Sequence, residues 1–380
     1  MPISRWCFPA WIAWLAAAAV LVAAVSIYRK GGVKPVPVMA TVQFSPDAVW
    51  QVTGVAPDGG SPASLPIGGT LRLSQGQVSI FTSPTASALI EGPSTLTFVS
   101  PESLHLAEGR GRFRLEKSRG QLEVTTPSMA AVGTAGDFGI ATRSGAPDEL
   151  HVFDGTVGMR LNGASESRTL SAGQAVRIAG AVGIEPFAAD TNRFQSRLSE
   201  FQTVMTAPFI KAEWRMDYGN PAISADGIDG VNYSIFRRLP QAEPSGNHPV
   251  LLATLETKIP STGSFHTDGW AGLSFFSSGN EVLFFGDTFG RERTWALDLR
   301  KGIPVSQTGE RQIVAKTVTL RYDRRTGEVS LHEGNLPLGP AFRSGTIAPE
   351  TTFDEIRLGA SSSAAFAVRS LTLRVGGGSQ

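Results

Sequence analysis

Residues that could carry out catalysis are present in this chain, but their spacing matches none of the common catalytic patterns. No two of the five histidines have the spacing of a metal-ligand pair; they are His105, His151, His248, His266 and His332. The sequence contains no Gly-x-Ser-x-Gly, His-Glu-x-x-His, phosphate-loop or dinucleotide-binding motif. We therefore predict that the chain is not an enzyme.

Hydrolysis of glycosidic bonds is the reaction that the sequence leaves open as an alternative. This reaction needs two carboxyl groups about 5–10 Å apart on either side of the bond. One large group of β-sandwich glycosidases supplies them from a Glu-x-Asp-x-x-Glu strand, and that spacing is absent. The pairs Asp354-Glu355 and Glu328/Glu333 do not reproduce it. A carbohydrate-degrading activity would need an arrangement without a recognisable motif.

Aromatic and acidic side chains between residues 217 and 287 are the candidate ligand-binding groups. The aromatic ones could form a platform for sugars, although alternation places most of them in a core; they are Trp270, Phe275, Phe276, Phe284 and Phe285. Loop aspartates could supply oxygen ligands for calcium; they are Asp217, Asp226, Asp229, Asp268 and Asp287. No calcium-loop spacing appears, so we predict no metal and keep calcium as the alternative. Trp270 and Asp268 are the predicted ligand-binding residues.

The charge balance argues against nucleic acid as a partner. The chain of 380 residues has 34 basic and 33 acidic side chains and a net charge of +1. Nucleic-acid binding would need a concentrated basic surface, and no Lys/Arg block occurs beyond residues 29–34. Cys7 is the only cysteine, so neither a disulfide nor a cysteine zinc site can stabilise the remaining residues.

The pattern of residues 42–182 predicts an all-β domain. Apolar residues alternate with polar ones at a period of two, in short runs separated by glycine and proline. Such runs are typical of half-buried strands in a β-sandwich or β-roll. Asp154-Gly155 lies between two runs, ELHVF and TVGMRL, and predicts a hairpin turn there.

Residues 183–208 are predicted to form a short helical connector. Phe194, Leu198, Phe201 and Met205 follow one another at steps of four, three and four, which places them on one face of a helix. The connector would pack this face on a domain surface.

Short strands return between residues 209 and 376. About nine runs of alternating residues, separated by loops rich in Gly, Pro, Ser and Asn, predict a two-sheet jelly roll. Thr326-Gly327 predicts an antiparallel turn between TVTLRY and EVSLH. Residues 377–380 are expected to be a frayed tail.

An apolar segment near the N-terminus predicts a membrane anchor. From Ala10 to Ile27 the chain has no charge, and a helix of that length covers roughly 27 Å, close to the hydrocarbon thickness of a bilayer. We predict a transmembrane helix over residues 10–28, preceded by a short segment at 1–9 and followed by a linker at 29–41. A cleaved signal peptide is the alternative, with cleavage after Val22-Ala23-Ala24.

The first β domain resembles the FecR domain, in the form common in envelope proteins of Planctomycetes and Verrucomicrobia. The matching residues are Glu91, Gly92, Pro93, Gly109, Thr126, Pro127, Gly133, Thr134, Phe138, Phe153, Gly155, Ala172, Gly173, Gln174 and Ala175. Ala135 and Gly136 depart from the usual Gly-Thr-acid-Phe pattern and are expected to change a turn. We interpret the matching glycines and prolines as residues that set backbone shape and carry no chemistry.

The FecR resemblance implies a place in cell-surface signalling. Proteins of that family relay the state of an outer-membrane transporter across the cytoplasmic membrane to a sigma factor. A single helix separates their sensor from an anti-sigma segment, and here only nine residues precede the apolar segment. The resemblance places the β domains in the periplasm. The positive-inside rule taken alone would place Arg29, Lys30 and Lys34, and the β domains that follow them, in the cytoplasm.

The second β domain is similar in pattern to concanavalin A-like or laminin-G-like jelly rolls, which often bind glycans. Together the two resemblances predict a single-pass protein of the bacterial cytoplasmic membrane that recognises a ligand and does not catalyse a reaction. Its expected partners are membrane lipid through residues 10–28, an outer-membrane transporter or another envelope protein, and a glycan. A carbohydrate-binding or carbohydrate-degrading envelope protein and a purely structural envelope component are the alternatives.

Overall fold

The computed structural model describes residues 39–54, 64–116, 120–179, 183–206, 208–263, 269–288, 295–300, 303–307 and 316–377. These residues form strands β1 to β26 and two short 3-10 helices, η1 (Thr191–Arg193) and η2 (Lys211–Glu213). The chain is mainly β, as predicted. The segment at 1–9, the expected anchor at 10–28 and nearly all of the linker lie outside the described residues. Within the described ranges, no helix has the length and apolar character needed to cross a membrane.

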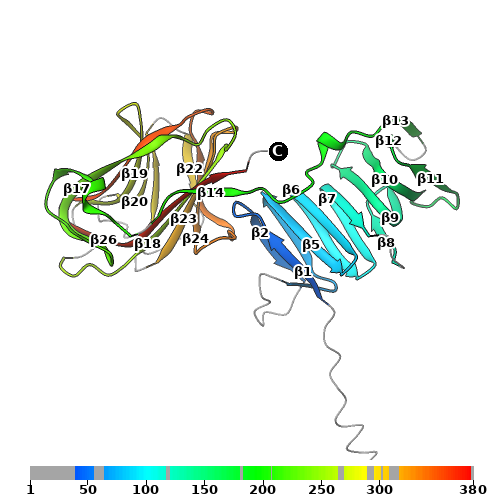
Figure 1. Ribbon diagram of the computed structural model, residues 1–380, viewed down its shortest axis with the longest axis horizontal. Coiled ribbons are helices and arrows are strands. Elements are labelled where there is room, and N and C mark those ends of the chain that lie inside the picture. The colour runs from blue at the N-terminus through cyan, green and yellow to red at the C-terminus, as the bar shows by residue number, and fades with distance from the viewer. Residues whose placement is uncertain are drawn as a thin grey trace, which may run out of the picture. The chain divides into compact units, whose positions relative to one another are not determined.

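The first 13 strands form one sheet, here called the N-terminal module (Figure 1). They are β1 (Met39–Phe44), β2 (Val49–Thr53), β3 (Ser64–Pro66), β4 (Thr70–Gln75), β5 (Gln77–Ser83), β6 (Ala86–Ser100), β7 (Ser103–Leu115), β8 (Leu122–Thr125), β9 (Met129–Thr142), β10 (Asp148–Leu161), β11 (Ser167–Ser171), β12 (Gln174–Ala179) and β13 (Gly183–Ala188). Nearly all neighbouring strands are antiparallel; β7 and β8 run parallel.

Four long strands, β6, β7, β9 and β10, change partners half-way along their length. The first half of β10 pairs with β12 and its second half pairs with β11. Likewise β6 pairs first with β5 and then with β4, and β9 pairs first with β8 and then with β7. Buried side chains from both halves belong to a single apolar core, so the sheet folds over on itself into two layers.

Glycines stand at the points where the long strands bend. Gly109 in β7, Gly136 in β9 and Gly155 in β10 have positive φ angles of 120°, 114° and 75°. In β6 the bend falls at Gly92-Pro93, between the segments that pair with β5 and β4. The backbone at these bends adopts conformations that side chains with a Cβ rarely tolerate, which explains why the sequence uses glycine there.

The hairpin predicted at Asp154-Gly155 is wrong, because β10 continues through these two residues. Gly155 faces Gly136 across the β9–β10 pair, and the pairing shifts on either side of them. A Cβ on Gly155 would lie 2.3 Å from the carbonyl oxygen of Ala135. Ala135 and Gly136, the departure from the FecR pattern, therefore pair with Thr156 and Gly155 inside the sheet, next to shifts in the pairing, and create no turn.

The other 13 strands form a second sheet, here called the C-terminal module. They are β14 (Phe201–Met205), β15 (Arg215–Tyr218), β16 (Ala222–Ser224), β17 (Gly227–Glu243), β18 (Val250–Thr257), β19 (Trp270–Ser277), β20 (Asn280–Thr288), β21 (Ala296–Leu299), β22 (Ile303–Gln307), β23 (Thr317–Asp323), β24 (Glu328–Glu333), β25 (Ala341–Thr346) and β26 (Phe353–Gly376). All its strand pairs are antiparallel, including β23 and β24 around Gly327, where the sequence predicts a turn.

Strand β26 joins the two layers of this sandwich (Figure 1). Its first part pairs with β17 and β19, and its last part pairs with β18 and β14. The sequence pattern suggests two separate strands here, DEIRLG and FAVRSLTLRV, but they form one strand of 24 residues with an irregularity at Ser362 (φ 57°). The core between the layers contains large buried side chains such as Tyr233, Phe285 and Phe353.

The helical connector predicted at 183–208 is also wrong. Strand β13 occupies its beginning, η1 is a single turn, and β14 pairs with β26 at its end. The apolar residues at helical spacing are used separately. Phe194 is buried against the N-terminal module, whereas Met205 belongs to the core of the C-terminal module.

Candidate ligand-binding face

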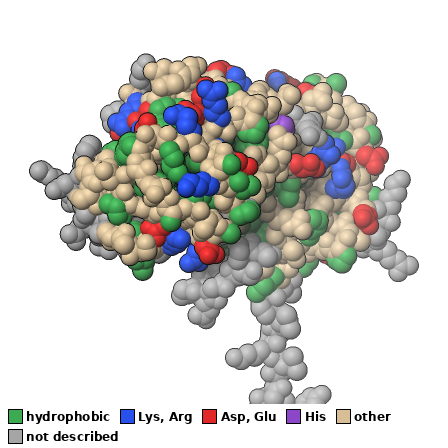
Figure 2. All heavy atoms as spheres, turned by 60° about the vertical axis from the view of Figure 1, so that its left-hand side comes forward, with side chains coloured by type: hydrophobic (Ala, Val, Ile, Leu, Met, Phe, Trp, Pro, Cys, Tyr) green, Lys and Arg blue, Asp and Glu red, His purple; other side chains and the backbone are tan. Residues whose placement is uncertain are grey.

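The side of the β17–β26–β19–β20 layer that faces away from the core carries aromatic and charged side chains in register, of which Ser274, Phe276 and Phe284 are buried. Phe284, Ser274, Arg357 and Phe236 follow one another across these four strands. We call this surface the arginine–aromatic face; it consists of Arg215, Tyr218, Phe236, Trp270, Ser274, Phe276, Glu281, Phe284, Arg300 and Arg357. Figure 2 shows the side of the molecule on which the C-terminal module comes forward, with basic, acidic and apolar side chains intermingled.

Arg357 lies at the centre of the face. Its guanidinium carbon is 4.4 Å from the centre of the Trp270 ring and 5.3 Å from that of Phe276, distances typical of cation–π contacts. Its Nη2 donates to Ser274 Oγ (2.9 Å) and to Glu281 Oε1 (2.7 Å). Its Nε is buried and has no hydrogen-bond partner among the residues that the structure describes. Burial lowers the pKa of Arg357 from its ordinary value.

Trp270 is half-buried, and its indole ring packs close to the backbone of Gly359. A Cβ on Gly359 would lie 3.0 Å from Trp270 Cη2, so glycine lets the indole approach the sheet closely. The ring meets Phe284 edge to face, with 6.0 Å between the ring centres. The structure therefore brings Trp270 into a cluster that the sequence did not reveal. Asp268, the other predicted ligand-binding residue, lies outside the described residues.

Ion pairs border the cluster. Arg300 donates from Nη2 to Glu281 (2.9 Å) and from Nη1 to Asp298 (2.6 Å). On the opposite side Arg215 pairs with Glu355 (3.3 Å) and lies over the ring of Phe236. Each of these carboxylates is thus engaged by a guanidinium. The alternation of DEIRLG, in which Ile356 and Leu358 are buried, is the sequence signal that could have placed Arg357 on this face.

The acidic residues and histidines of the described ranges do not gather into a metal site. No group of three or more His, Cys, Asp or Glu side chains that could hold a metal ion occurs among them. Asp229 accepts a hydrogen bond from the Ser261 amide (2.9 Å), and Asp287 is buried. The four described histidines do not form a cluster, because the ring of each one is hydrogen-bonded to a different residue. These pairs are His105 with Thr125, His151 with Glu149, His248 with Gln202 and His332 with Gly339.

The signature residues of the N-terminal module occupy bends, turns and the core. Thr126 lies in the turn between β8 and β9, where its hydroxyl donates to the buried Asp148 (2.6 Å) and Pro127 follows it. Gly173 (φ 84°) forms the β11–β12 turn, and Gln174 accepts a hydrogen bond from the Ser171 amide there. Phe138 is buried and stacks on Phe113. Gly133 lies beneath the Phe138 ring, and Thr134 follows it in β9.

Residues 190–199, here called the strap, are bound along the N-terminal module by side chains of that module. The hydrogen bonds run from the Asp190 amide to His151 Nδ1 (3.2 Å), from Arg110 to the Arg193 carbonyl (2.6 Å), from the Gln195 amide to Glu91 Oε1 (3.0 Å) and from the Ser199 amide to Gln77 Oε1 (2.7 Å). The ring of Phe194 lies directly over Gly139. The signature residue Glu91 therefore positions the strap.

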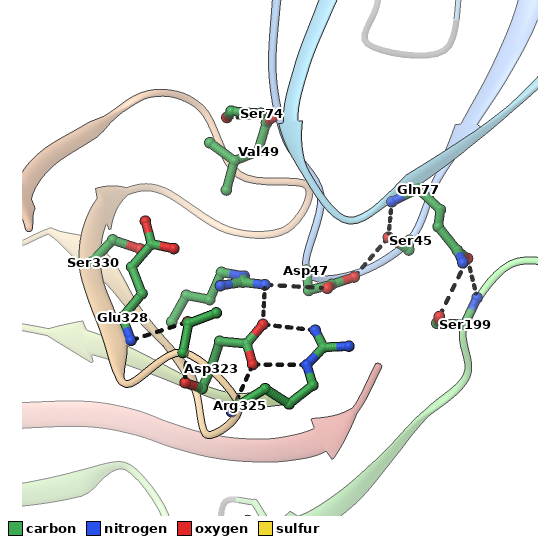
Figure 3. A network of polar contacts seen from close by, with 12 residues as sticks. Ser45, Asp47, Val49, Ser74, Gln77, Ser199, Asp323, Arg325, Glu328 and Ser330 are labelled. Carbon is green, nitrogen blue, oxygen red and sulfur yellow. Dashed lines mark hydrogen bonds and ion pairs between the residues drawn. The ribbon is translucent and has the colours of Figure 1, made fainter. Parts of the chain in front are cut away.

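A buried contact joins the two modules (Figure 3). Leu338 bridges to β2: its amide donates to the Ala48 carbonyl (2.9 Å), and its carbonyl accepts from the Trp50 amide (3.2 Å). Its side chain belongs to an apolar cluster with Val49, Val250 and Leu252. Through Leu338, the loop after β24 behaves as a short extra strand beside β2.

Charged side chains lie beside this apolar contact. Arg321 is 2% exposed, and its Nη2 lies 3.6 Å from Asp47 Oδ2 and 3.3 Å from Asp323 Oδ2. Ser45 donates to Asp47 (2.7 Å), as Figure 3 shows. Burial raises the pKa of Asp323, but hydrogen bonds from Arg325 and the charge of Arg321 outweigh it, so the pKa lies below its ordinary value.

Comparisons with known proteins show only distant similarities. No protein-family model and no curated protein matches the chain. Among solved structures it is similar to an anti-sigma-factor-like protein of Parabacteroides distasonis, with 14% identity, a TM-score of 0.30, and coverage of 35% of this chain and 66% of that one. The match thus spans just under two thirds of that protein.

Two further solved structures are similar to larger parts of the chain. The CBM2 module of the evolved Dit protein from Lactobacillus casei BL23 phage J-1 matches with 8% identity and a TM-score of 0.34, covering 47% of this chain and 97% of the module. The xylan β-1,4-xylosidase of Bacillus halodurans C-125 matches with 10% identity and a TM-score of 0.28, covering 85% and 73%. Membership of the FecR and concanavalin A-like families stays a prediction.

Proposed function

We propose that this chain is a non-catalytic recognition protein of the bacterial cell envelope that binds a carbohydrate through the arginine–aromatic face. The observation that carries this proposal is the position of Arg357 over Trp270. Sugars have hydroxyl oxygens that accept hydrogen bonds and apolar ring faces that pack on aromatic side chains. The exposed Tyr218 side chain and the half-buried indole of Trp270 offer both kinds of contact, and the Arg357 guanidinium packs against that indole.

The carboxylates of the face favour binding over hydrolysis. A glycosidase needs one carboxyl group that donates a proton and a second that acts as nucleophile or base. Here Glu281 accepts hydrogen bonds from two arginines, and Asp298 and Glu355 each pair with one. A carboxylate held by guanidinium groups is a poor proton donor. The alternative of a carbohydrate-degrading protein is therefore the less favoured one.

A glycan array probed with the full chain tests this proposal. We expect binding to one family of polysaccharides, with about tenfold weaker binding by Trp270→Ala and Arg357→Lys, since each removes a contact of about 1–2 kcal/mol. Arg160→Ala, a substitution at an exposed residue of the N-terminal module, is the matched control. Equal binding by all variants would exclude this face as the site. Release of reducing ends from the bound polysaccharide would show that the protein is an enzyme.

Relay of a signal is the second candidate function, and the buried contact between the modules favours it. A ligand on the C-terminal module could alter the N-terminal module only through groups that both modules share, such as Arg321 and Asp47. In cells, Asp47→Ala should keep ligand binding and lose the transcriptional response to the ligand. A response unchanged in this variant would argue against relay through this contact.

The envelope location is a further part of the proposal. We propose that residues 10–28 anchor the chain in the cytoplasmic membrane and that the two modules lie in the periplasm, because long domains can translocate despite flanking basic residues. Alkaline phosphatase fused after Gln380 should be active. An inactive phosphatase fusion together with an active cytoplasmic reporter would contradict this orientation. Release of the fusion in soluble form would favour a cleaved signal peptide.

A further inference from the structure

A pocket in the N-terminal module lies apart from the arginine–aromatic face. Its volume is about 410 Å³, which is within the range of small-molecule sites. Residues near the bends of β6 and β7, the β9–β10 turn and the strap line it. Four of the lining residues are arginines: Arg110, Arg143, Arg177 and Arg193.

Two of the three acidic side chains that line the pocket are largely buried, whereas its basic side chains are more exposed. The carboxylates of Glu149 and Glu91 are only 9% and 17% exposed, whereas the side chains of Arg110, Arg177 and Arg193 are each 42% exposed. Arg143 is also exposed, and Glu108 is the exposed carboxylate among the lining residues. A molecule entering the pocket therefore meets four guanidinium groups and one carboxylate.

The buried carboxylates have their partners already. Glu149 accepts hydrogen bonds from Arg177 (2.9 Å) and contacts Arg193 and His151. Burial raises the pKa of Glu149, but these partners outweigh it and hold the pKa below its ordinary value. Glu91 accepts from the Gln195 amide, and burial raises its pKa. Neither carboxylate needs a further cation from a ligand.

Three of the four arginines, Arg110, Arg143 and Arg193, keep donors that the described residues do not use, whereas Arg177 is held by Glu149 and Glu185. A guanidinium has five N–H donors, yet Arg110 and Arg193 contact the described residues through Nη1 only. The Arg143 side chain forms no ion pair within the described ranges. Planar guanidinium groups with free N–H pairs are the usual partners of carboxylate and phosphate groups in proteins.

We propose that this pocket binds a small organic anion that carries at least two carboxylate or phosphate groups. One anionic group would contact Arg143 and Arg110, and the other would contact Arg177 and Arg193. Arg193 belongs to the strap, whereas Arg110 and Arg177 belong to strands of the sheet and Arg143 to the β9–β10 turn, so the bound anion would also hold the strap in place. This site is independent of the carbohydrate proposed for the C-terminal module.

Calorimetric titration of the full chain with succinate and with inorganic pyrophosphate tests the proposal and separates the two anion chemistries. We expect saturable binding of one of them at the ratio of one per chain, and about tenfold weaker binding by Arg143→Ala. Arg143 is exposed and unpaired, so the variant should fold normally. Arg160→Ala, which removes an exposed arginine in the second half of β10, should bind as tightly as the unchanged chain.

Hydrogen exchange gives an independent readout. The Gln195 amide of the strap should exchange several-fold more slowly when the anion is bound, and this slowing should be lost in Arg143→Ala. The absence of saturable binding up to about 10 mM of either anion would overturn the proposal. Equally weakened anion binding in Arg143→Ala and Arg160→Ala would also overturn the proposal. Such a result would show that the anion is attracted only by the net charge of the protein.

Discussion

His332 is a fully buried residue whose two ring nitrogens are both hydrogen-bonded. Nδ1 lies 2.7 Å from the Gly339 carbonyl, which can only accept, so Nδ1 carries the proton. Ser330 then donates to Nε2 (2.8 Å). Burial, together with the charge of Arg321, lowers the pKa of His332 to about 4. The folded protein therefore holds this histidine in its neutral form at neutral pH.

Acid should destabilise the protein through His332. The unfolded chain takes up a proton near pH 6.5, whereas the folded chain does so only near pH 4, so stability is lost as the pH falls between these values. The loss from this residue is about 3 kcal/mol when complete. Urea unfolding at a series of pH values measures it. His332→Gln should show a smaller loss, and an identical pH dependence in both proteins would contradict the assignment.

Gly139 is another single residue with a defined role, because the ring of Phe194 lies on it. A Cβ there would lie 2.8 Å from two ring atoms. We expect Gly139→Ala to lower the free energy of unfolding by about 1–3 kcal/mol and to loosen the strap. Gly158→Ala is the matched control, since its nearest atom would be 3.8 Å away. Equal stability of the two variants in urea unfolding would refute this role of Gly139.

At the scale of the element, the bent strands of the N-terminal module depend on glycine for two reasons that can be separated. Gly155 in β10 and Gly145 in the β9–β10 turn both have φ of 75°. A Cβ on Gly155 would clash with the Ala135 carbonyl oxygen at 2.3 Å, whereas a Cβ on Gly145 would have no atom within 4 Å. At Gly155, both the positive φ and the lack of space for a Cβ require glycine. At Gly145, only the positive φ does.

Alanine at these two glycines should therefore have different effects. Gly145→Ala should cost about 1–2 kcal/mol, which is the strain of a left-handed backbone. Gly155→Ala should cost clearly more, because the β9–β10 pair must also move apart. Thermal or urea unfolding of the full chain measures both. If Gly155→Ala were no more destabilising than Gly145→Ala, the close pairing of Gly155 with Gly136 would not be essential to the bend.

At the scale of the whole molecule, the ion pair between Asp47 and Arg321 couples the two modules. Arg321 Nε and Nη1 are buried and have no partner among the described residues, so its charge is compensated by the two carboxylates near Nη2, Asp323 from its own module and Asp47 from the other. Asp47→Ala should cost about 3 kcal/mol and should separate the unfolding of the two modules into two transitions. Arg369→Ala, which breaks an exposed pair with Glu256, should cost less than about 1 kcal/mol.

A single transition in Asp47→Ala, with unfolding at the same denaturant concentration as the unchanged chain, would show that the modules are not coupled through this pair. Denaturant unfolding followed by fluorescence and by circular dichroism distinguishes these outcomes, because the two probes coincide only for a single cooperative unit.

The strands could be predicted from sequence because their period of two is a local signal, as in TVTLRY and EVSLH, which form β23 and β24. The strap and β14 could not be predicted, because Phe194 and Phe201 have helical spacing but pack against partners far away in the sequence, Gly139 and β26. Asp154-Gly155 fits both a hairpin and a bent strand, since each needs a positive φ. Trp270 was found by type alone, whereas Arg357 becomes a neighbour only through strand pairing.

Strand β26 has a consequence for how the protein is made. It supplies a shared strand to both layers of the C-terminal module, and all its partners, β14, β17, β18 and β19, precede it in the sequence. During translation these partners leave the ribosome with unpaired edges and stay so until residues 353–376 are synthesised. Such edges invite pairing with other chains. Newly made protein should therefore need a chaperone until β26 is available, although the N-terminal module already has all of its strands.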